Sequence, residues 1–93
     1  MEWNLESSTT LGQNIPNPFS DETEIPFYLK KPEFVKLVVY DAFGREIAVL
    51  VNEYRQPGKH SAIYRSPNLY NGVYFYRLEA GGIIETRKMQ LIR

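Results

Sequence analysis

The side chains that could do chemistry are few, and they do not form a catalytic set. His60 is the only histidine of the 93 residues, and the chain has no cysteine. A thiol nucleophile and a cysteine–histidine zinc cluster are therefore excluded. The strand pattern places His60 beside Ala62 and Tyr64, so we expect a packed or rim residue rather than a general base. No serine lies in a nucleophile motif, and we expect a chain that is not an enzyme.

An acidic turn and the tyrosines could instead form a binding site. Asp21, Glu22 and Glu24 offer carboxylates, but they lack the ligand spacing of a known calcium loop, so we expect a solvated turn and no metal. The seven tyrosines could form a carbohydrate platform. At strand spacing, however, most should be core residues with solvated hydroxyl groups. Gly81-Gly82 is too short to hold a phosphate, and no cofactor is expected.

Composition narrows the class of protein. A chain of 93 residues with 43% hydrophobic and 14% aromatic residues fits one small domain with one core. The 11 Lys and Arg residues balance 11 Asp and Glu residues, which argues against a nucleic-acid binder and a polybasic membrane patch. No apolar run approaches the ~20 residues of a membrane span. The start lacks a signal-peptide pattern, so we expect a cytosolic domain or a part of a longer exported chain.

The end of the chain predicts a β-hairpin. Two β-rich runs flank Gly81-Gly82, which suits a two-residue turn with positive φ angles. This turn would pair Tyr76 with Arg87 and Phe75 with Lys88. One face of the hairpin would then carry Tyr74, Tyr76, Leu78, Met89 and Leu91. The last strand is therefore expected to be a structural member of the domain.

The preceding residues predict further short strands and no helix. The expected strands lie at 23–30, around Val35, Leu37 and Val39, at 45–51 and at 59–65. Pro26 predicts an edge or bulged strand, and apolar residues on both faces of 45–51 predict a well-covered strand. Asp41-Ala42-Phe43-Gly44 is typical of a type I turn. We therefore predict one all-β domain, an antiparallel immunoglobulin-like β-sandwich of about seven strands, with Tyr74 at its tyrosine corner.

The first residues predict a linker followed by an extended edge segment. Residues 1–10 are mostly polar without periodicity, and Trp3 is expected to be an incidental linker residue. Residues 11–19 hold two prolines at a spacing of two, which excludes a helix and a central strand. Leu11, Ile15 and Phe19 are expected to dock on the core. The domain would therefore span 11–93.

Several short motifs together resemble a known family. They are Gln13-Asn14-Ile15-Pro16-Asn17-Pro18-Phe19, Val38-Val39-Tyr40-Asp41-Ala42-Phe43-Gly44-Arg45-Glu46-Ile47-Ala48, Gly58-Lys59-His60, Gly72-Val73-Tyr74-Phe75-Tyr76-Arg77-Leu78 and Thr86-Arg87-Lys88-Met89-Gln90-Leu91. In order and spacing they resemble the type A C-terminal sorting domain of type IX (Por) secretion substrates of Bacteroidetes and related bacteria. Tyr64 departs from the tryptophan often found at that point. The immunoglobulin-like domain of flagellar hook-capping proteins is also similar, but the Pro-Asn-Pro-Phe opening and the basic-apolar ending favour the sorting domain.

The resemblance implies a non-catalytic secretion signal at the C-terminus of a larger protein. The type IX outer-membrane translocon would recognise the folded domain after the parent has crossed the inner membrane. A sortase-like peptidase often removes such domains, and the passenger is released or anchored at the cell surface; we expect cleavage before Leu11. The expected recognition residues are Gly72, Tyr74, Arg87, Lys88, Leu91, Ile92 and Arg93. Gly72 and Tyr74 would act by shaping the hairpin, and the basic residues by contact.

A different class of function stays open. An immunoglobulin-like structural or adhesive module would bind a protein or a glycan, and position within the parent protein distinguishes it from a sorting tag. In addition, an exposed last strand suggests homodimerisation through edge pairing.

Overall fold

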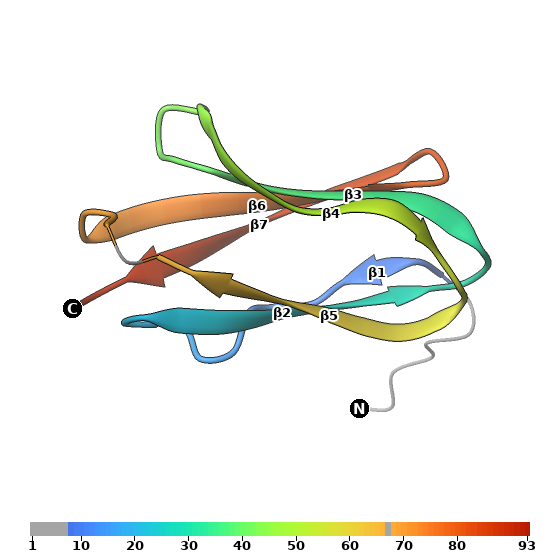
Figure 1. Ribbon diagram of the computed structural model, residues 1–93, viewed down its shortest axis with the longest axis horizontal. Helices are drawn as coiled ribbons and strands as arrows, with labels where there is room; N and C mark the ends of the chain where they lie inside the picture. Colours follow the sequence, from blue (N-terminus) through green and yellow to red (C-terminus); the bar gives the residue numbers. More distant parts are fainter. Residues whose placement is uncertain (1–7, 67) are drawn as a thin grey trace.

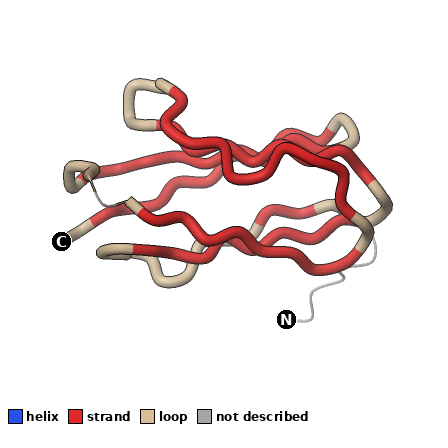
Figure 2. Tube along the Cα trace, viewed as in Figure 1, coloured by secondary structure: helices blue, strands red, loops and turns tan. Residues whose placement is uncertain are grey.

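Two antiparallel β-sheets packed face to face form the domain (Figures 1 and 2). The computed structural model describes residues 8–66 and 68–93, so the predictions for Trp3, the rest of residues 1–7 and Pro67 lie outside the described residues. The described part of the chain holds seven strands and no helix. The all-β sandwich and the single domain predicted from the sequence are confirmed.

The strands divide into a three-stranded and a four-stranded sheet. Their bounds are β1 Thr10–Leu11, β2 Glu22–Leu29, β3 Glu33–Tyr40, β4 Glu46–Arg55, β5 Gly58–Arg65, β6 Gly72–Ala80 and β7 Ile83–Leu91. The first sheet has the order β1-β2-β5, and the second has the order β4-β3-β6-β7. The last hairpin thus forms one side of the second sheet, with β7 as its edge strand.

The register of the last hairpin agrees with the sequence prediction. Tyr76 pairs with Arg87 and Phe75 with Lys88 around the turn at Gly81 and Gly82. Both glycines have positive φ angles, 56° and 83°, where residues with a Cβ are strained. The turn therefore sets the register and directs alternate residues of β6 and β7 into the core.

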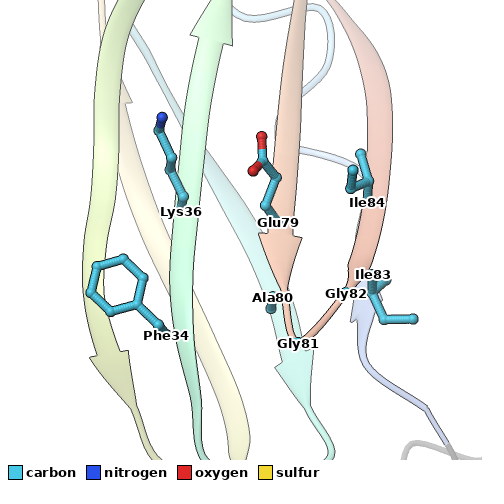
Figure 3. A pocket seen from close by; sticks show the side chains of 8 residues that line it. All are labelled: Phe34, Lys36, Glu79, Ala80, Gly81, Gly82, Ile83 and Ile84. Carbon is cyan, nitrogen blue, oxygen red and sulfur yellow. The ribbon is translucent and has the colours of Figure 1, made fainter.

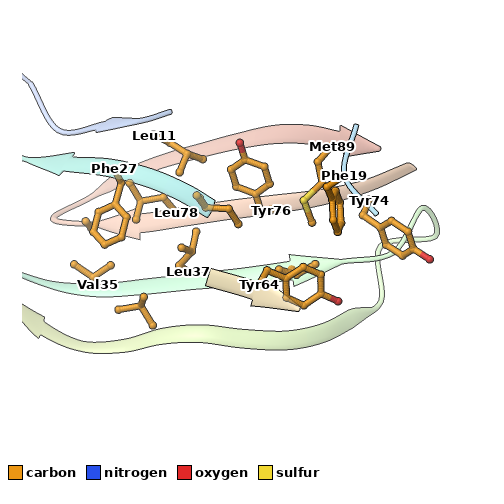
Figure 4. Packing of buried hydrophobic residues seen from close by; sticks show 14 of the residues in the cluster. Leu11, Phe19, Phe27, Val35, Leu37, Tyr64, Tyr74, Tyr76, Leu78 and Met89 are labelled. Carbon is orange, nitrogen blue, oxygen red and sulfur yellow. The ribbon is translucent and has the colours of Figure 1, made fainter. Parts of the chain in front are cut away.

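The core fills the space between the inner faces of the two sheets. Figure 4 shows Tyr76, Leu78 and Met89 of the hairpin packed toward residues of the opposite sheet and of β3. The predicted inner face of β3 is confirmed, because Val35, Leu37 and Val39 are fully buried. Complete burial of such side chains is worth ~1.5–3 kcal/mol each.

Pro26 lies in a central strand, so the edge-strand prediction was wrong. β2 is hydrogen-bonded to β1 on one side and to β5 on the other. The carbonyl of Pro26 accepts from the Gly12 amide at 2.8 Å, so the position of its missing N–H also faces the β1 side. β1 is only two residues long, and the sheet therefore loses little by having proline there.

The prediction for residues 45–51 also needs correction. The strand β4 is longer, and Val49 is 46% exposed rather than covered. The pairing of β3 with β4 is irregular between Leu37 and Val38 and again between Val39 and Tyr40. Such bulges insert extra residues and change which side chains face the core, so strict alternation fails in this strand.

The segment that precedes β2 docks on the core through two of its three predicted residues. Leu11 and Phe19 are buried as expected, but Ile15 is 67% exposed. The backbone of Ile15 exchanges two hydrogen bonds with Glu24, while the neighbouring Asn14 side chain turns inward. Asn14 thus takes the inner position, because its backbone and side-chain amides form hydrogen bonds with buried groups that are described below.

The chain enters the sandwich at one end and finishes at the other. The hydroxyl of Thr9 accepts from the Lys30 amide at 3.2 Å, which places the start of β1 beside the β2–β3 connection. The β3–β4 turn, the residues before β6 and Arg93 lie at the opposite end (Figure 1). We call this second end the distal end.

Candidate functional site

The seven predicted recognition residues do not form one surface. Tyr74 and Leu91 are buried in the core, whereas Lys88 lies on the outer face of the sheet opposite Phe75. Arg87 lies on the inner face, and Ile92 and Arg93 lie at the distal end. The exposed members thus face three directions.

Tyr74 fastens the loop before β6. Its hydroxyl donates to the Tyr70 carbonyl at 2.6 Å, four residues upstream. This contact is the predicted tyrosine corner and is confirmed. The side chain is 7% exposed and packs in the core, so it holds the position of Tyr70 rather than offering itself to a partner.

Gly72 supplies a backbone conformation at the start of β6. Its φ angle is +149°, within the region that favours glycine. A Cβ at this position would meet no heavy atom within 4 Å, so space is not what requires glycine. Gly72 pairs with Leu91 and begins the hairpin ladder.

The side chains of Arg87 and Glu85 connect β7 to β1 of the opposite sheet. The Arg87 guanidinium donates through Nε to the Leu11 carbonyl, and the Leu11 amide donates to Glu85 Oε1, both at 2.8 Å. One residue of β1 is therefore held by two charged side chains of β7. Hydrogen bonds to charged groups are stronger than those between neutral groups. Arg87 thus has a structural partner within the chain.

Residues 13–19 close the second half of the β7 edge. The Asn17 side chain accepts from the Gln90 amide at 2.9 Å, and Phe19 bonds both the Gln90 carbonyl and the Ile92 amide. In addition, the side-chain amide of Gln13 donates to the Lys88 carbonyl at 2.9 Å. We call residues 13–19 the strap. The strap covers backbone groups that an edge strand normally leaves open to other chains.

The inner end of the strap is fixed by a buried polar network. The Tyr76 hydroxyl accepts from the Asn14 amide at 2.8 Å and donates to the Gly12 carbonyl at 2.7 Å. The Asn14 side-chain amide donates to the Thr23 hydroxyl at 3.0 Å and to the Pro16 carbonyl at 3.1 Å. Burial raises the pKa of the Tyr76 hydroxyl to about 12.

Arg93 binds the distal loops together. Its guanidinium donates to the carbonyls of Leu69 at 2.6 Å and Ser20 at 3.1 Å. Its amide donates to the Asn71 side chain at 3.0 Å. Beside it, Ile92 is 48% exposed although its amide bonds the strap. Arg93 therefore contacts both the loop before β2 and the loop before β6.

The β3–β4 turn forms the other half of the distal end. The predicted four-residue turn is confirmed, since the Gly44 amide donates to the Asp41 carbonyl at 3.0 Å. The Asp41 carboxylate accepts from the amides of Arg45 and Phe43 and from Arg45 Nε. The Arg45 amide, chiefly, lowers the pKa of the Asp41 carboxyl. Between this turn and residues 68–74 lies a hollow of about 370 Å³, which we call the distal cleft.

A second hollow lies on the outer face of the four-stranded sheet, near the hairpin turn (Figure 3). Its volume is about 310 Å³, and it is shallow. Figure 3 shows Lys36 and Glu79 on neighbouring strands, between the apolar side chains of Phe34 and Ile84. The hollow offers an apolar surface but no buried polar group.

The groups that could support catalysis are occupied in structural contacts. His60 stacks on Phe27 at 5.3 Å, and its Nε2 lies 2.7 Å from the Gln56 carbonyl, as expected for a packed rim residue. Across residues 8–66 and 68–93, no group of three His, Cys, Asp or Glu side chains could hold a metal ion. Asp21 and Glu22 of the acidic turn lie near Arg93 and Arg65 instead. Within the described residues, no helix is long and apolar enough to span a membrane.

Sequence reasoning missed the polar residues that hold the strap and β1 in place. Asn17 accepts from the Gln90 amide and Glu85 from the Leu11 amide, whereas the Asn14 side chain binds Thr23 and Pro16. No periodic pattern marks such contacts. The sequence signal for these contacts is the motif Asn14-Ile15-Pro16-Asn17-Pro18-Phe19. Its prolines predicted an extended segment, but its asparagines were assigned no structural role. The exposed aromatic residues of the distal cleft, Phe43 and Tyr70, were missed as well.

Comparison with known proteins gives one match. The family model described as a secretion system C-terminal sorting domain matches residues 14–92. The matched range includes the strap from Asn14 onward and every strand from β2 to β7. No curated protein and no solved structure gave a significant match.

Proposed function

Because this chain belongs to the family of secretion-system C-terminal sorting domains, we propose that it is a non-catalytic tag by which the type IX outer-membrane translocon recognises a larger protein. The observation that carries this proposal is the family match over 79 of the 93 residues, counted from 14 to 92 inclusive. The parent protein would reach the medium or the cell surface through the periplasm.

The geometry supports a tag that is read as a folded unit. The strap and β7 hold each other through backbone and side-chain hydrogen bonds, although they come from opposite ends of the domain. Loss of either segment would therefore disturb the other. A rigid domain of this kind presents its surface without an additional ordering cost when it binds.

The seven residues divide into two proposed roles. Lys88 and Ile92 are exposed, and Lys88 has no ion-pair partner within the described residues, so they are available for direct contact. Gly72, Tyr74 and Leu91 would act by holding the hairpin and the core. Arg87 and Arg93 combine exposure with contacts inside the domain, so their replacement would affect shape as well as charge.

We also propose that a sortase-like peptidase acts upstream of the sandwich. Peptidases require an extended, accessible chain. The hydroxyl of Thr9 accepts from the Lys30 amide, and Thr10 pairs with Tyr28, so the chain is already tied to β2 at these residues. Cleavage would therefore lie before Thr9. N-terminal sequencing or mass analysis of the released domain would locate it, and a new end within β1 or the strap would contradict this placement.

Export of a reporter tests the sorting function. The full chain is fused behind a signal peptide and a fluorescent protein and expressed in a bacterium with a type IX system. We expect the fusion to reach the surface or the medium, while the same reporter without the domain stays in the periplasm. If the fusion folds but also stays in the periplasm, the sorting function is wrong and the adhesive module becomes the better hypothesis.

Charge-removing variants test the contact role. We expect the double variant Arg87→Gln, Lys88→Gln to lower export, while Lys59→Gln, on an exposed position of the other sheet, does not. Melting curves separate misfolding from lost contact, because Arg87 also binds the Leu11 carbonyl. Normal export of a folded double variant would exclude the contact role of these two residues.

A further inference from the structure

We propose that the distal cleft is the docking surface for a translocon protein, and that it receives an apolar side chain next to a carboxylate. This inference rests on the proposed sorting function and adds a surface to it. The cleft lies between the β3–β4 turn and residues 68–74. None of its residues was among the predicted recognition residues except Gly72 and Tyr74.

Two aromatic side chains stand at the cleft almost without contacts to the core. Phe43 is 86% exposed and Tyr70 is 88% exposed. Ile47, Leu69 and Val73 also line the cleft and are half-buried. Exposure of two large aromatic residues does not stabilise the isolated domain. Such residues are enriched at binding surfaces, because they bury a large area with few rotatable bonds.

Both aromatic residues are held on rigid supports. The Phe43 amide donates to the Asp41 carboxylate at 2.9 Å, which fixes the turn. The carbonyl of Tyr70 accepts from the Tyr74 hydroxyl, and Arg93 binds the adjacent Leu69 carbonyl. A preorganised surface binds with a smaller loss of conformational entropy. Tyr74, a predicted recognition residue that is buried, and Arg93 thus both position this cleft.

One charged group at the cleft can bind a carboxylate of the partner. Arg45 has a side chain that is 76% exposed and uses its Nε on Asp41 at 2.7 Å. Its two terminal nitrogens have no hydrogen-bond partner within residues 8–66 and 68–93, so they can bind a carboxylate in a bidentate manner. The Asp41 carboxylate already accepts three hydrogen bonds and offers little to a donor.

Two polar side chains of the cleft are not available to a glycan. Sugar hydroxyl groups need both donors and acceptors around an aromatic platform. The Asn71 side chain is engaged with the backbone of Arg93 through both its oxygen and its nitrogen, and the Asp41 carboxylate is occupied. An apolar side chain with a neighbouring carboxylate matches the two exposed aromatic rings and the free terminal nitrogens of Arg45.

The position of the cleft fits docking of a tagged protein. The chain enters β1 at the opposite end of the sandwich, beside the β2–β3 connection (Figure 1). A passenger attached upstream therefore leaves the distal end accessible. Phe19 of the strap and Ile92, which are hydrogen-bonded to each other, also lie at the distal end, so one partner can contact the cleft and the end of β7 together.

Export of reporter variants tests this surface. The double variant Phe43→Ser, Tyr70→Ser is compared with Tyr54→Ser, a control on β4 whose side chain is 74% exposed. We expect the double variant to lower export about tenfold, as hot-spot residues do, and the control to be exported like the unchanged domain. Melting temperatures within about 2 °C of each other would show that folding is retained.

The outcomes separate this surface from the sorting function itself. Normal export of the folded double variant overturns the docking surface and leaves the sorting function intact. Retention of the unchanged domain overturns both. A photoreactive phenylalanine at position 70 identifies the occupant: we expect an adduct with an outer-membrane component of the type IX system, absent when the label stands at position 54. An adduct of two copies of the chain, or an adduct with polysaccharide, overturns the proposed partner.

Discussion

Hydroxyl groups of tyrosine fasten two segments outside the sheets to the core. Tyr76 reaches from β6 to the backbone at Gly12 and Asn14, and Tyr74 reaches from the same strand to Tyr70. In each case the aromatic ring is buried, and the hydroxyl group forms a hydrogen bond with a backbone group outside the two sheets. The phenol thus provides hydrophobic packing and a specific hydrogen bond at one position.

Removal of one hydroxyl tests this role. We expect Tyr76→Phe to lower the free energy of unfolding by ~1–3 kcal/mol, because it leaves the Asn14 amide and the Gly12 carbonyl without their partner. Tyr64→Phe is the matched control, since Tyr64 is also buried and its hydroxyl has no protein partner among the described residues. Urea denaturation of both variants measures the difference. Equal losses would show that the hydroxyl of Tyr76 contributes nothing specific.

The raised pKa of Tyr76 predicts a loss of stability in alkali. The ordinary pKa of tyrosine is ~10, whereas the pKa of Tyr76 in the fold is about 12 because of burial. The unfolded chain therefore loses this proton first. The stabilising effect is complete below pH ~10 and is lost as pH rises toward 12. We expect the tyrosinate absorbance to show one tyrosine that ionises only at high pH, at the same pH at which the domain unfolds. Full ionisation of all seven tyrosines with the fold intact would contradict this.

At the scale of elements, the strap divides the edge of β7 into two parts. Outward-facing groups of Gln90 and Ile92 bond Asn17 and Phe19, whereas the same edge at Ile84 and Thr86 has no partner within the described residues. The outward direction follows from the two-residue turn, which makes Ala80 and Ile83 a hydrogen-bonded pair. The strap thus protects the half of the edge that lies nearest Arg93.

Hydrogen exchange tests the division of this edge. We expect the amides of Gln90 and Ile92 to exchange slowly and those of Ile84 and Thr86 to exchange fast. Asn17→Ala removes the acceptor for Gln90, so exchange at Gln90 should rise about fivefold, the effect of ~1 kcal/mol. Asn52→Ala, on the exposed side of β4, is the control. Slow exchange along the whole edge would contradict the predicted open part.

Local patterns were sufficient for most of these elements. The glycine pair at Gly81 fixed the hairpin register, and alternation identified the inner face of β3 from Val35 to Val39. Both signals are short-range, because turn geometry and the two-residue period of a strand depend only on neighbouring residues. The type I turn after Tyr40 follows from the same kind of signal.

The errors came from contacts between distant parts of the chain. Pro26 was assigned to an edge strand. It lies in a central strand instead, because the neighbouring strand β1 is too short to require a hydrogen bond from the Pro26 nitrogen. Ile15 was assigned to the core, yet Asn14 takes that place because Tyr76 and Thr23 satisfy it. The predicted recognition residues lie mostly in or just after the last strand. The distal cleft, in contrast, lies between two loops that are more than twenty residues apart in sequence.

For the whole molecule, a segment from the beginning of the domain and its last strand meet at one edge of the sandwich. The strap comes from the beginning and β7 from the end, and together they carry Phe19 and Leu91 into the core. The unprotected backbone on this side is limited to the hairpin half of β7, next to the exposed side chains of Ile83 and Ile84. An exposed edge beside apolar residues is a site for pairing with another strand.

We therefore expect weak homodimerisation through antiparallel pairing of the hairpin halves of two β7 strands. Thr86→Pro tests it, because the N–H of Thr86 faces outward and its loss removes no hydrogen bond to β6. Light scattering over a concentration series should show a rising average mass for the unchanged chain and a constant monomer mass for the variant. Glu46→Pro, at the beginning of β4, which is the other edge strand of this sheet, tests pairing through β4 instead. A monomer mass at every concentration of the unchanged chain would show that the strap and the short length of open edge are enough to prevent pairing.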